Sequence, residues 1–167
     1  MLILRLSKIA LTAAVALYAS LVAFGNITDY DTNFAFVHHV FLMDTVFPDA
    51  TIKYRAIELP LLHHLGYIAI IAAETGTALR CWWRGAARLW RRRNAPARDF
   101  NRGKDVAIAG LTLGFLLWQV AFMSIGGEWF GMWMSSQWNG IESAFRVFVT
   151  ILAVLIYLAL ADREIEE

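Results

Sequence analysis

One acidic residue, Glu74, lies well inside an apolar stretch of the sequence, where an ionisable side chain is costly and usually has a purpose. A carboxylate there could relay protons, bind an ion or form a structural hydrogen bond. Thr112 or Gln119 of a neighbouring helix, or Arg80 nearby, could be its partner. Because the chain lacks the inverted repeats and broken helices typical of transporters, we favour the structural role.

Histidines are the second group of residues capable of chemistry, and they occur as two adjacent pairs: His38, His39, His63 and His64. With Met43 or Asp44 they could bind a transition metal or ligate haem. Adjacent residues on a helix point about 100° apart, so neither pair can readily chelate one ion. We therefore predict no cofactor and no metal site, and expect these side chains to form hydrogen bonds near a membrane surface.

The segment 126–146, GGEWFGMWMSSQWNGIESAFR, separates two apolar stretches and carries Trp129, Trp133 and Trp138. Indole rings favour the boundary between hydrocarbon and water, so this segment is predicted to lie at a membrane surface. Trp129 and Trp133 are one helical turn apart in the sequence.

The same segment contains the polar start of the last apolar stretch. Asn139 and Glu142 have the spacing of a capping box. Glu142 and Arg146 are four residues apart, which suits an ion pair on one helix face. A charge at Arg146, about one turn inside the membrane, needs such a partner.

The composition identifies a membrane protein, because 59% of the 167 residues are hydrophobic and the mean hydropathy is +0.51. No nucleophile or phosphate-binding motif is present, which favours a non-enzymatic role. The one cysteine, Cys81, has no second thiol to pair with and is predicted to fill space near a helix end.

Four stretches reach the length needed to cross a bilayer, at approximately 9–25, 57–79, 106–125 and 145–161. We expect one domain over residues 1–167, an all-α transmembrane bundle of four helices. The first stretch resembles a signal peptide, but its weak cleavage site favours an uncleaved helix. A GxxxG pair, Gly110 and Gly114, is expected to let helices approach closely within the bundle.

Positive charges give the expected orientation, since nine of the fifteen Lys and Arg residues lie in a basic loop at 80–104. With Arg5, Lys8 and Arg163 on the same side, both termini are predicted to be cytoplasmic. The basic loop should contact anionic headgroups and not nucleic acid. The arginines at 84, 88, 91 and 92 recur at helical spacing, so the second helix could continue as far as Pro96.

The opposite side carries a connection at 26–56 that is too long for a simple turn. Asp31 or Thr32 could cap a helix that begins near Asn33 and ends at Pro48. We expect this amphipathic helix to lie in the outer interface, against the tryptophan segment.

The pattern MW-x-S-x-x-WNG-x-x-x-AFR over residues 132–146, together with NITDYDTNFAFVHHVFLMDTVFPD, resembles a family of small bacterial integral membrane proteins of unknown function. At Met134 and Ile141 the family pattern has glutamine. The resemblance covers nearly the whole chain and implies four helices in the bacterial cytoplasmic membrane, with no activity to inherit.

Three functions remain open from the sequence. We favour an accessory protein that docks to a larger membrane complex through its outer aromatic surface. The residues expected at this surface or in its support are Trp129, Trp133, Trp138, Asn139, Glu142, Arg146 and Glu74. The alternatives are a small transporter or ion-conducting protein that uses Glu74 and Arg146, and a redox subunit with haem or metal on the four histidines.

Overall fold

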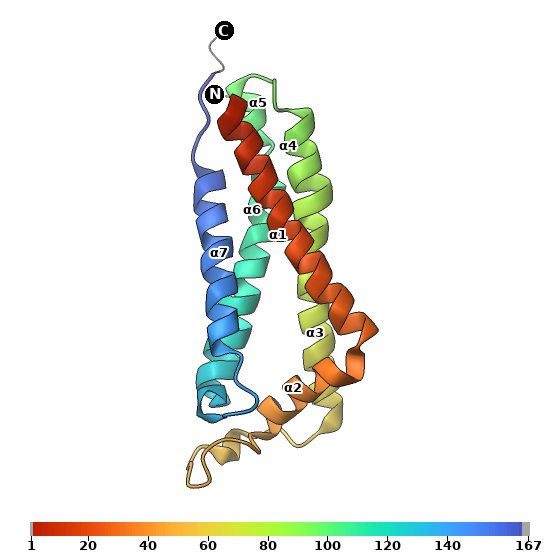
Figure 1. The fold of residues 1–167 in the computed structure, drawn as a ribbon, viewed down its shortest axis with the longest axis vertical. Coiled ribbons are helices and arrows are strands. Elements are labelled where there is room, and N and C mark those ends of the chain that lie inside the picture. The colour runs from red at the N-terminus through yellow and green to blue at the C-terminus, as the bar shows by residue number, and fades with distance from the viewer. Residues whose placement is uncertain (1, 165–167) are drawn as a thin grey trace.

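The computed structural model describes residues 2–164, apart from the side chain of Arg84, and all regular elements in that range are helical. Long helices run along one axis (Figure 1), while shorter ones close its two ends. The long elements are α1 (Leu2–Thr28), the run α3 (Pro60–Leu79), η2 (Arg80–Ala86) and α4 (Ala87–Arg91), the run α6 (Asp105–Leu116) and η3 (Leu117–Trp129), and α7 (Ile141–Ala159).

Both chain termini lie at one end of the bundle, which we call the terminal end, and α5 (Ala97–Arg102) closes it. The opposite end, called the α2 end, carries the short elements α2 (Tyr30–Leu42), η1 (Lys53–Arg55) and η4 (Met132–Met134). Helix α1 packs against α3 and η2 more extensively than against α7.

Three helices have the length and hydropathy of a membrane span: Leu2–Thr28, Ala97–Trp129 and Ile141–Ala159. Helix α3 lies alongside them (Figure 1), but it contains two histidines and Glu74, which lower its hydropathy. The protein is therefore an all-helical membrane protein with three candidate spans.

Helices extend well beyond the predicted apolar stretches, because their polar ends find partners within the bundle. The predicted first span, 9–25, is part of an α1 of 27 residues. The basic segment 80–104, predicted to be a loop, is largely helical: α3 continues through the π-helical η2 to Arg91, and α5 follows. The expected extension of this helix beyond the membrane is thus confirmed as helix, although it ends before Pro96.

The prediction for the connection at 26–56 was right about a helix but wrong about its bounds. Because α1 continues to Thr28, α2 begins at Tyr30 instead of Asn33. It ends at Leu42 instead of near Pro48, because Met43 adopts a left-handed conformation with φ 51° and its N–H donates to the Val40 carbonyl.

Close approach between α6 and the α3–η2 helix depends on glycines, as the GxxxG pair predicts. A methyl group on Gly110 would lie 2.9 Å from Cβ of Arg80 and from Sγ of Cys81. One on Gly114 would lie 3.0 Å from Cγ2 of Thr77. Cys81 is fully buried and fills space at this contact, as expected, but it lies within the helical run that continues to Arg91 and not near a helix end. In an apolar medium such close packing is what holds helices together.

Buried charges tie the terminal end together. Lys8 and Lys104 both pair with the Asp162 carboxylate, and all three side chains are at most 5% exposed. Both ammonium groups also donate to the Leu160 carbonyl at 2.7 Å. Burial alone would raise the pKa of Asp162, but hydrogen bonds from the two lysines outweigh this and lower it.

Arg5 completes this end of the bundle from the first turn of α1. Its Nη1 donates to the carbonyl oxygens of Arg93 at 3.0 Å and Ala95 at 2.6 Å, and its Nη2 to that of Arg163 at 3.2 Å. Its guanidinium lies over the Phe100 ring at 4.8 Å. The start of α1 is thereby connected to the segment before α5 and to the segment after α7.

We expect Gly110→Ala to destabilise the bundle by about 1–3 kcal/mol, because the added methyl group would overlap Arg80 and Cys81. Gly25→Ala is the matched control, since nothing lies within 4 Å of its added methyl group. Thermal unfolding in one detergent should show a lower midpoint for Gly110→Ala and an unchanged or higher midpoint for Gly25→Ala. Equal midpoints for the two variants would contradict this packing.

Asp162→Asn should cost about 3–5 kcal/mol, because it leaves two buried ammonium groups without a carboxylate. Since folding lowers the Asp162 pKa, its stabilisation is present above the ordinary aspartate range and is lost as pH falls through the lowered pKa. Thermal unfolding midpoints between neutral and acidic pH measure this loss of stability. In Asp162→Asn the part of the pH dependence that Asp162 causes should be absent. The exposed carboxylate variant Glu142→Gln serves as control and should unfold much like the parent.

Candidate functional site

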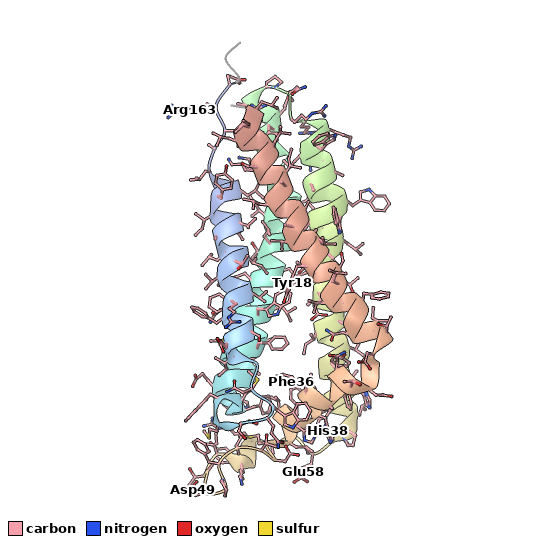
Figure 2. All side chains as sticks on the ribbon, in the orientation of Figure 1. Tyr18, Phe36, His38, Asp49, Glu58 and Arg163 are labelled. Atoms are coloured by element: carbon pink, nitrogen blue, oxygen red, sulfur yellow. The ribbon has the colours of Figure 1, made fainter. Side chains whose placement is uncertain are left out.

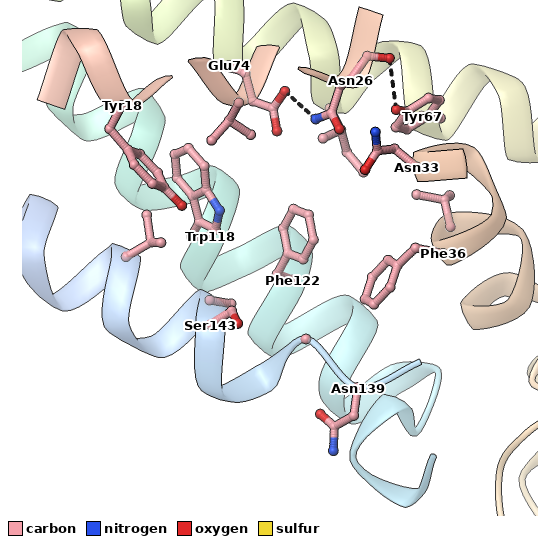
Figure 3. Close-up of a pocket in the computed structure, with 16 residues that line it drawn as sticks. Tyr18, Asn26, Asn33, Phe36, Tyr67, Glu74, Trp118, Phe122, Asn139 and Ser143 are labelled. Atoms are coloured by element: carbon pink, nitrogen blue, oxygen red, sulfur yellow. Dashed lines mark hydrogen bonds between the residues drawn. The ribbon is translucent and has the colours of Figure 1, made fainter. Parts of the chain in front are cut away.

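The most distinctive internal feature is a polar cavity of about 340 Å³ in the half of the bundle nearer α2, here called the Glu74 pocket. Its wall combines residues of α1, α2, α3, η3 and α7, so five elements must be in place to form it. Figure 3 shows the polar and aromatic residues that line it: Tyr18, Asn26, Asn33, Phe36, Tyr67, Glu74, Trp118, Phe122, Asn139 and Ser143.

Glu74 is 1% exposed and its carboxylate points into this pocket (Figure 3). Asn26 Nδ2 donates to Glu74 Oε2 at 2.8 Å, and the Tyr67 hydroxyl donates to the backbone carbonyl of Asn26 at 3.0 Å. Thr112, Gln119 and Arg80, the partners expected from the sequence, do not bond to it. Because α1 extends past Gly25, Asn26 of the first helix reaches Glu74 instead.

Within residues 2–164, Asn26 is the one hydrogen-bond partner of Glu74, and no cation pairs with it. A carboxylate can accept up to about four hydrogen bonds, so much of its capacity is unused. His63, Tyr67 and Glu74 of α3 are all buried. Only Tyr67 and Glu74 reach the pocket.

Aromatic rings form the wall of the pocket between Glu74 and α7. Tyr18 and Trp118 have ring centroids 6.0 Å apart, tilted by 52°. Phe122 lies one turn further along η3, and its ring is 6.4 Å from that of Phe36 of α2. Trp118 is 5% exposed, and its indole N–H donates to no side chain or carbonyl among the described residues.

A second cavity of about 300 Å³, the α1–α7 groove, adjoins the pocket between the two helices. Apolar residues of both helices line it, with Thr150 and the stem of Arg146. Tyr18 and Val147 belong to both cavities. Glu74 and Arg146, predicted to line one path, therefore line two adjoining cavities.

The predicted ion pair between Glu142 and Arg146 is confirmed, and both side chains are more than 70% exposed. The predicted capping box is wrong, because Gly140 and not Asn139 is the N-cap residue of α7. Asn139 Oδ1 accepts from the Ile141 N–H at 3.1 Å, but Glu142 points to Arg146 and not back to the helix start.

The four histidines gather at the α2 end, where each has a hydrogen-bond partner. His38 and His63 share a hydrogen bond between their Nδ1 atoms at 2.9 Å, and His63 Nε2 donates to the Ile57 carbonyl at 2.6 Å. His39 bonds to Asp44 at 2.7 Å and His64 to the Tyr30 hydroxyl at 2.9 Å.

These contacts select one arrangement of protons when both rings of the histidine pair are neutral. Since Nε2 of His63 carries a proton for the Ile57 carbonyl, its Nδ1 in the neutral ring accepts, and His38 Nδ1 donates. Burial and the neighbouring His63 lower the pKa of His38, which favours this neutral arrangement. Over residues 2–164, no three His, Cys, Asp or Glu side chains are grouped to hold a metal ion.

The tryptophan segment packs against α2, as its position in the sequence suggests, but it is not one continuous loop. Trp129 ends η3, while Trp133 lies in η4, and Gly131 with φ 64° separates them, so they are not successive turns of one helix. Trp138 stacks on His39 with centroids 4.6 Å apart. Trp129 and Trp133 remain 53% and 48% exposed.

Sequence reasoning found Glu74 but missed the residues that surround it. Asn26 was placed beyond the first span, and Tyr18 and Trp118 were indistinguishable from other aromatic residues of apolar helices. The helical spacing of Tyr18, Val22 and Asn26, four residues apart on one face of α1, is the signal that could have identified this wall. Figure 2 shows Tyr18 midway along the bundle, far from His38 at the α2 end.

Comparison with known proteins agrees with the apolar helical architecture. No curated protein and no solved structure gave a significant match to the chain. A family model described as "predicted small integral membrane protein (DUF2165)" matches residues 4–161. With nearly its whole length matched and helices apolar enough to cross a bilayer, this chain belongs to the DUF2165 family of small integral membrane proteins.

Proposed function

We propose that this membrane protein is a non-enzymatic binding protein, which holds the polar group of a small molecule between its helices in the Glu74 pocket. The observation that carries the proposal is a carboxylate that is 1% exposed, lies inside the bundle, faces a cavity and has one hydrogen-bond partner. A buried carboxyl group with unfilled hydrogen-bonding positions is unfavourable in an apolar medium. A ligand that donates hydrogen bonds would remove much of that cost.

The composition of the wall favours binding over catalysis. Its described residues include neither His, Lys nor Cys, so Ser143 has no basic neighbour there to activate its hydroxyl. A volume of about 340 Å³ falls in the range of small-molecule sites. The mixture of aromatic walls and a few polar groups is also typical of such sites.

The interior beyond Glu74 argues against an ion-conducting path that uses Glu74 and Arg146. Toward the terminal end, Ala16, Cys81 and Leu111 are fully buried and Ile151 is 2% exposed. These apolar side chains pack in one cluster, and hydrated ions do not cross such a layer. The transport alternative would require these helices to separate.

We also propose that α3 is a fourth crossing and that the terminal end faces the cytoplasm of a bacterium, across its inner membrane. Twelve of the fifteen Lys and Arg residues belong to that side of the sequence. Arg88, Arg91 and Arg92 lie beside the exposed Trp83, in a position suited to anionic headgroups.

A second function, docking to a larger membrane complex, has support from a different observation. Four aromatic side chains at the α2 end are between 48% and 78% exposed: Phe47, Tyr54, Trp129 and Trp133. Phe47 and Trp133 are in edge contact, with centroids 5.8 Å apart. Exposed aromatic residues that sit next to one another are typical of interaction surfaces.

Binding in the pocket can be tested without knowing the ligand. We expect native mass spectrometry of protein released from nanodiscs to show a small molecule that wild type retains and Glu74→Gln loses by about tenfold, because a hydrogen bond to a charged group is lost. Glu58→Gln, at an exposed position away from the pocket, should retain it. Identical spectra for wild type and Glu74→Gln would overturn the proposal.

Docking makes a separate prediction. Trp133→Ala should abolish cross-linking to a partner in intact membranes, because about half of this ring is available for contact. Trp83→Ala, at a still more exposed ring on the terminal end, should leave the cross-link unchanged. Mass spectrometry of the cross-linked product measures both. A wild-type protein that forms no product, or a product insensitive to Trp133→Ala, would remove the support for docking.

A further inference from the structure

Two adjoining cavities of different character lie side by side in this bundle. The Glu74 pocket is lined by a carboxylate, three asparagines, a serine and two tyrosines, whereas the α1–α7 groove is formed mainly by aliphatic side chains. Tyr18 and Val147 line both, so the two cavities meet at these residues. Figure 3 shows the Tyr18 ring at one side of the pocket, beside Trp118.

The groove is positioned to open toward lipid tails. It lies between α1 and α7, both of which have the length and hydropathy of spans. Apolar side chains next to it are exposed on both helices: Leu11 by 41%, Leu17 by 51%, Phe145 by 51% and Val149 by 41%. In a bilayer such a surface contacts hydrocarbon, so an alkyl chain could enter the groove sideways.

The polar pocket favours a cation over an anion. Glu74 is the one acidic or basic residue in its described wall, and it has no ion-pair partner within residues 2–164. The rings of Tyr18, Trp118 and Phe122 surround the same space. A carboxylate among aromatic rings is suited to an ammonium group, because the ring faces attract cations and the carboxylate neutralises the charge.

We propose that the two cavities form one site for a cationic amphiphile, with an ammonium head against Glu74 and an alkyl chain in the α1–α7 groove. This inference rests on the proposed binding function of the Glu74 pocket and adds the class of ligand. The chain gains little from the groove compared with lipid, since both are apolar. The groove holds the chain beside the head group, so the site selects ammonium compounds that already lie in the bilayer.

Protection of Glu74 from a membrane-permeant carbodiimide provides a test specific to this side chain. Labelling is read by peptide mass spectrometry in phosphatidylglycerol nanodiscs. Dodecyltrimethylammonium should protect Glu74 at a concentration about tenfold or more below tetramethylammonium, because its chain concentrates it in the membrane. Dodecanol, which has the chain but no charge, should not protect.

A groove variant separates chain binding from partitioning. Ala14 lines the groove but not the pocket and lies at an exposed position of α1, so Ala14→Phe fills the groove without entering the core. It should weaken protection by dodecyltrimethylammonium about fivefold or more, and change protection by tetramethylammonium less than about twofold. Labelling without ligand should match wild type, which verifies that the variant folds.

Each outcome tests a different part of the proposal: the pocket, the chain site or the recognition of the cation. If Glu74 is not labelled and neither ammonium compound stabilises wild type against thermal unfolding, the binding pocket itself is wrong. If both ammonium compounds protect but Ala14→Phe changes neither, the pocket remains and the chain site is overturned. If dodecanol protects as well as dodecyltrimethylammonium, recognition of the cation is overturned.

Discussion

The hydrogen bond from Asn26 to Glu74 connects α1 to α3 at the point on which the geometry of the bundle depends. It is reinforced by the Tyr67 hydroxyl, which donates to the backbone of the same asparagine. Inside a membrane, polar side chains have few alternatives to one another, so such a pair fixes where two helices meet. Because α1 is held against α3 here, it stays away from α7, and the α1–α7 groove and the Glu74 pocket remain open.

The glycine contact of α6 complements this arrangement on the other side of α3. Gly110 and Gly114 let α6 approach Arg80, Cys81 and Thr77 without intervening side chains. With α6 so close to the α3–η2 helix, the following segment η3 carries Trp118 and Phe122 into the space between α3 and α7. The pocket thus depends on the close contact between α6 and the α3–η2 helix and on the separation between α1 and α7.

Much of the architecture could be predicted from the sequence, whereas the environment of Glu74 could not. Apolar length and cation placement indicate membrane helices, and Glu74 stands out by its depth. Helix ends were misjudged where polar residues find partners inside the protein: Arg5 bonds to three backbone carbonyls, so α1 begins well before the apolar stretch. Asn26 reaches Glu74 only because α1 also continues past Gly25, and the contact joins residues 48 positions apart. No local pattern specifies such a pair.

The buried carboxylates of Asp162 and Glu74 differ in a way that bears on function. At the terminal end, Asp162 accepts from two lysines whose ammonium groups are also bonded to a carbonyl, so charges and hydrogen bonds compensate each other within the fold. At Glu74 the carboxylate has an asparagine, no cation and an adjoining cavity. Desolvation is unfavourable for both carboxylates, but only at Asp162 do cations of the chain itself compensate for it. A polar cluster that serves stability alone would be expected to resemble the first. The uncompensated carboxylate beside an open cavity is therefore better explained by a molecule that binds there.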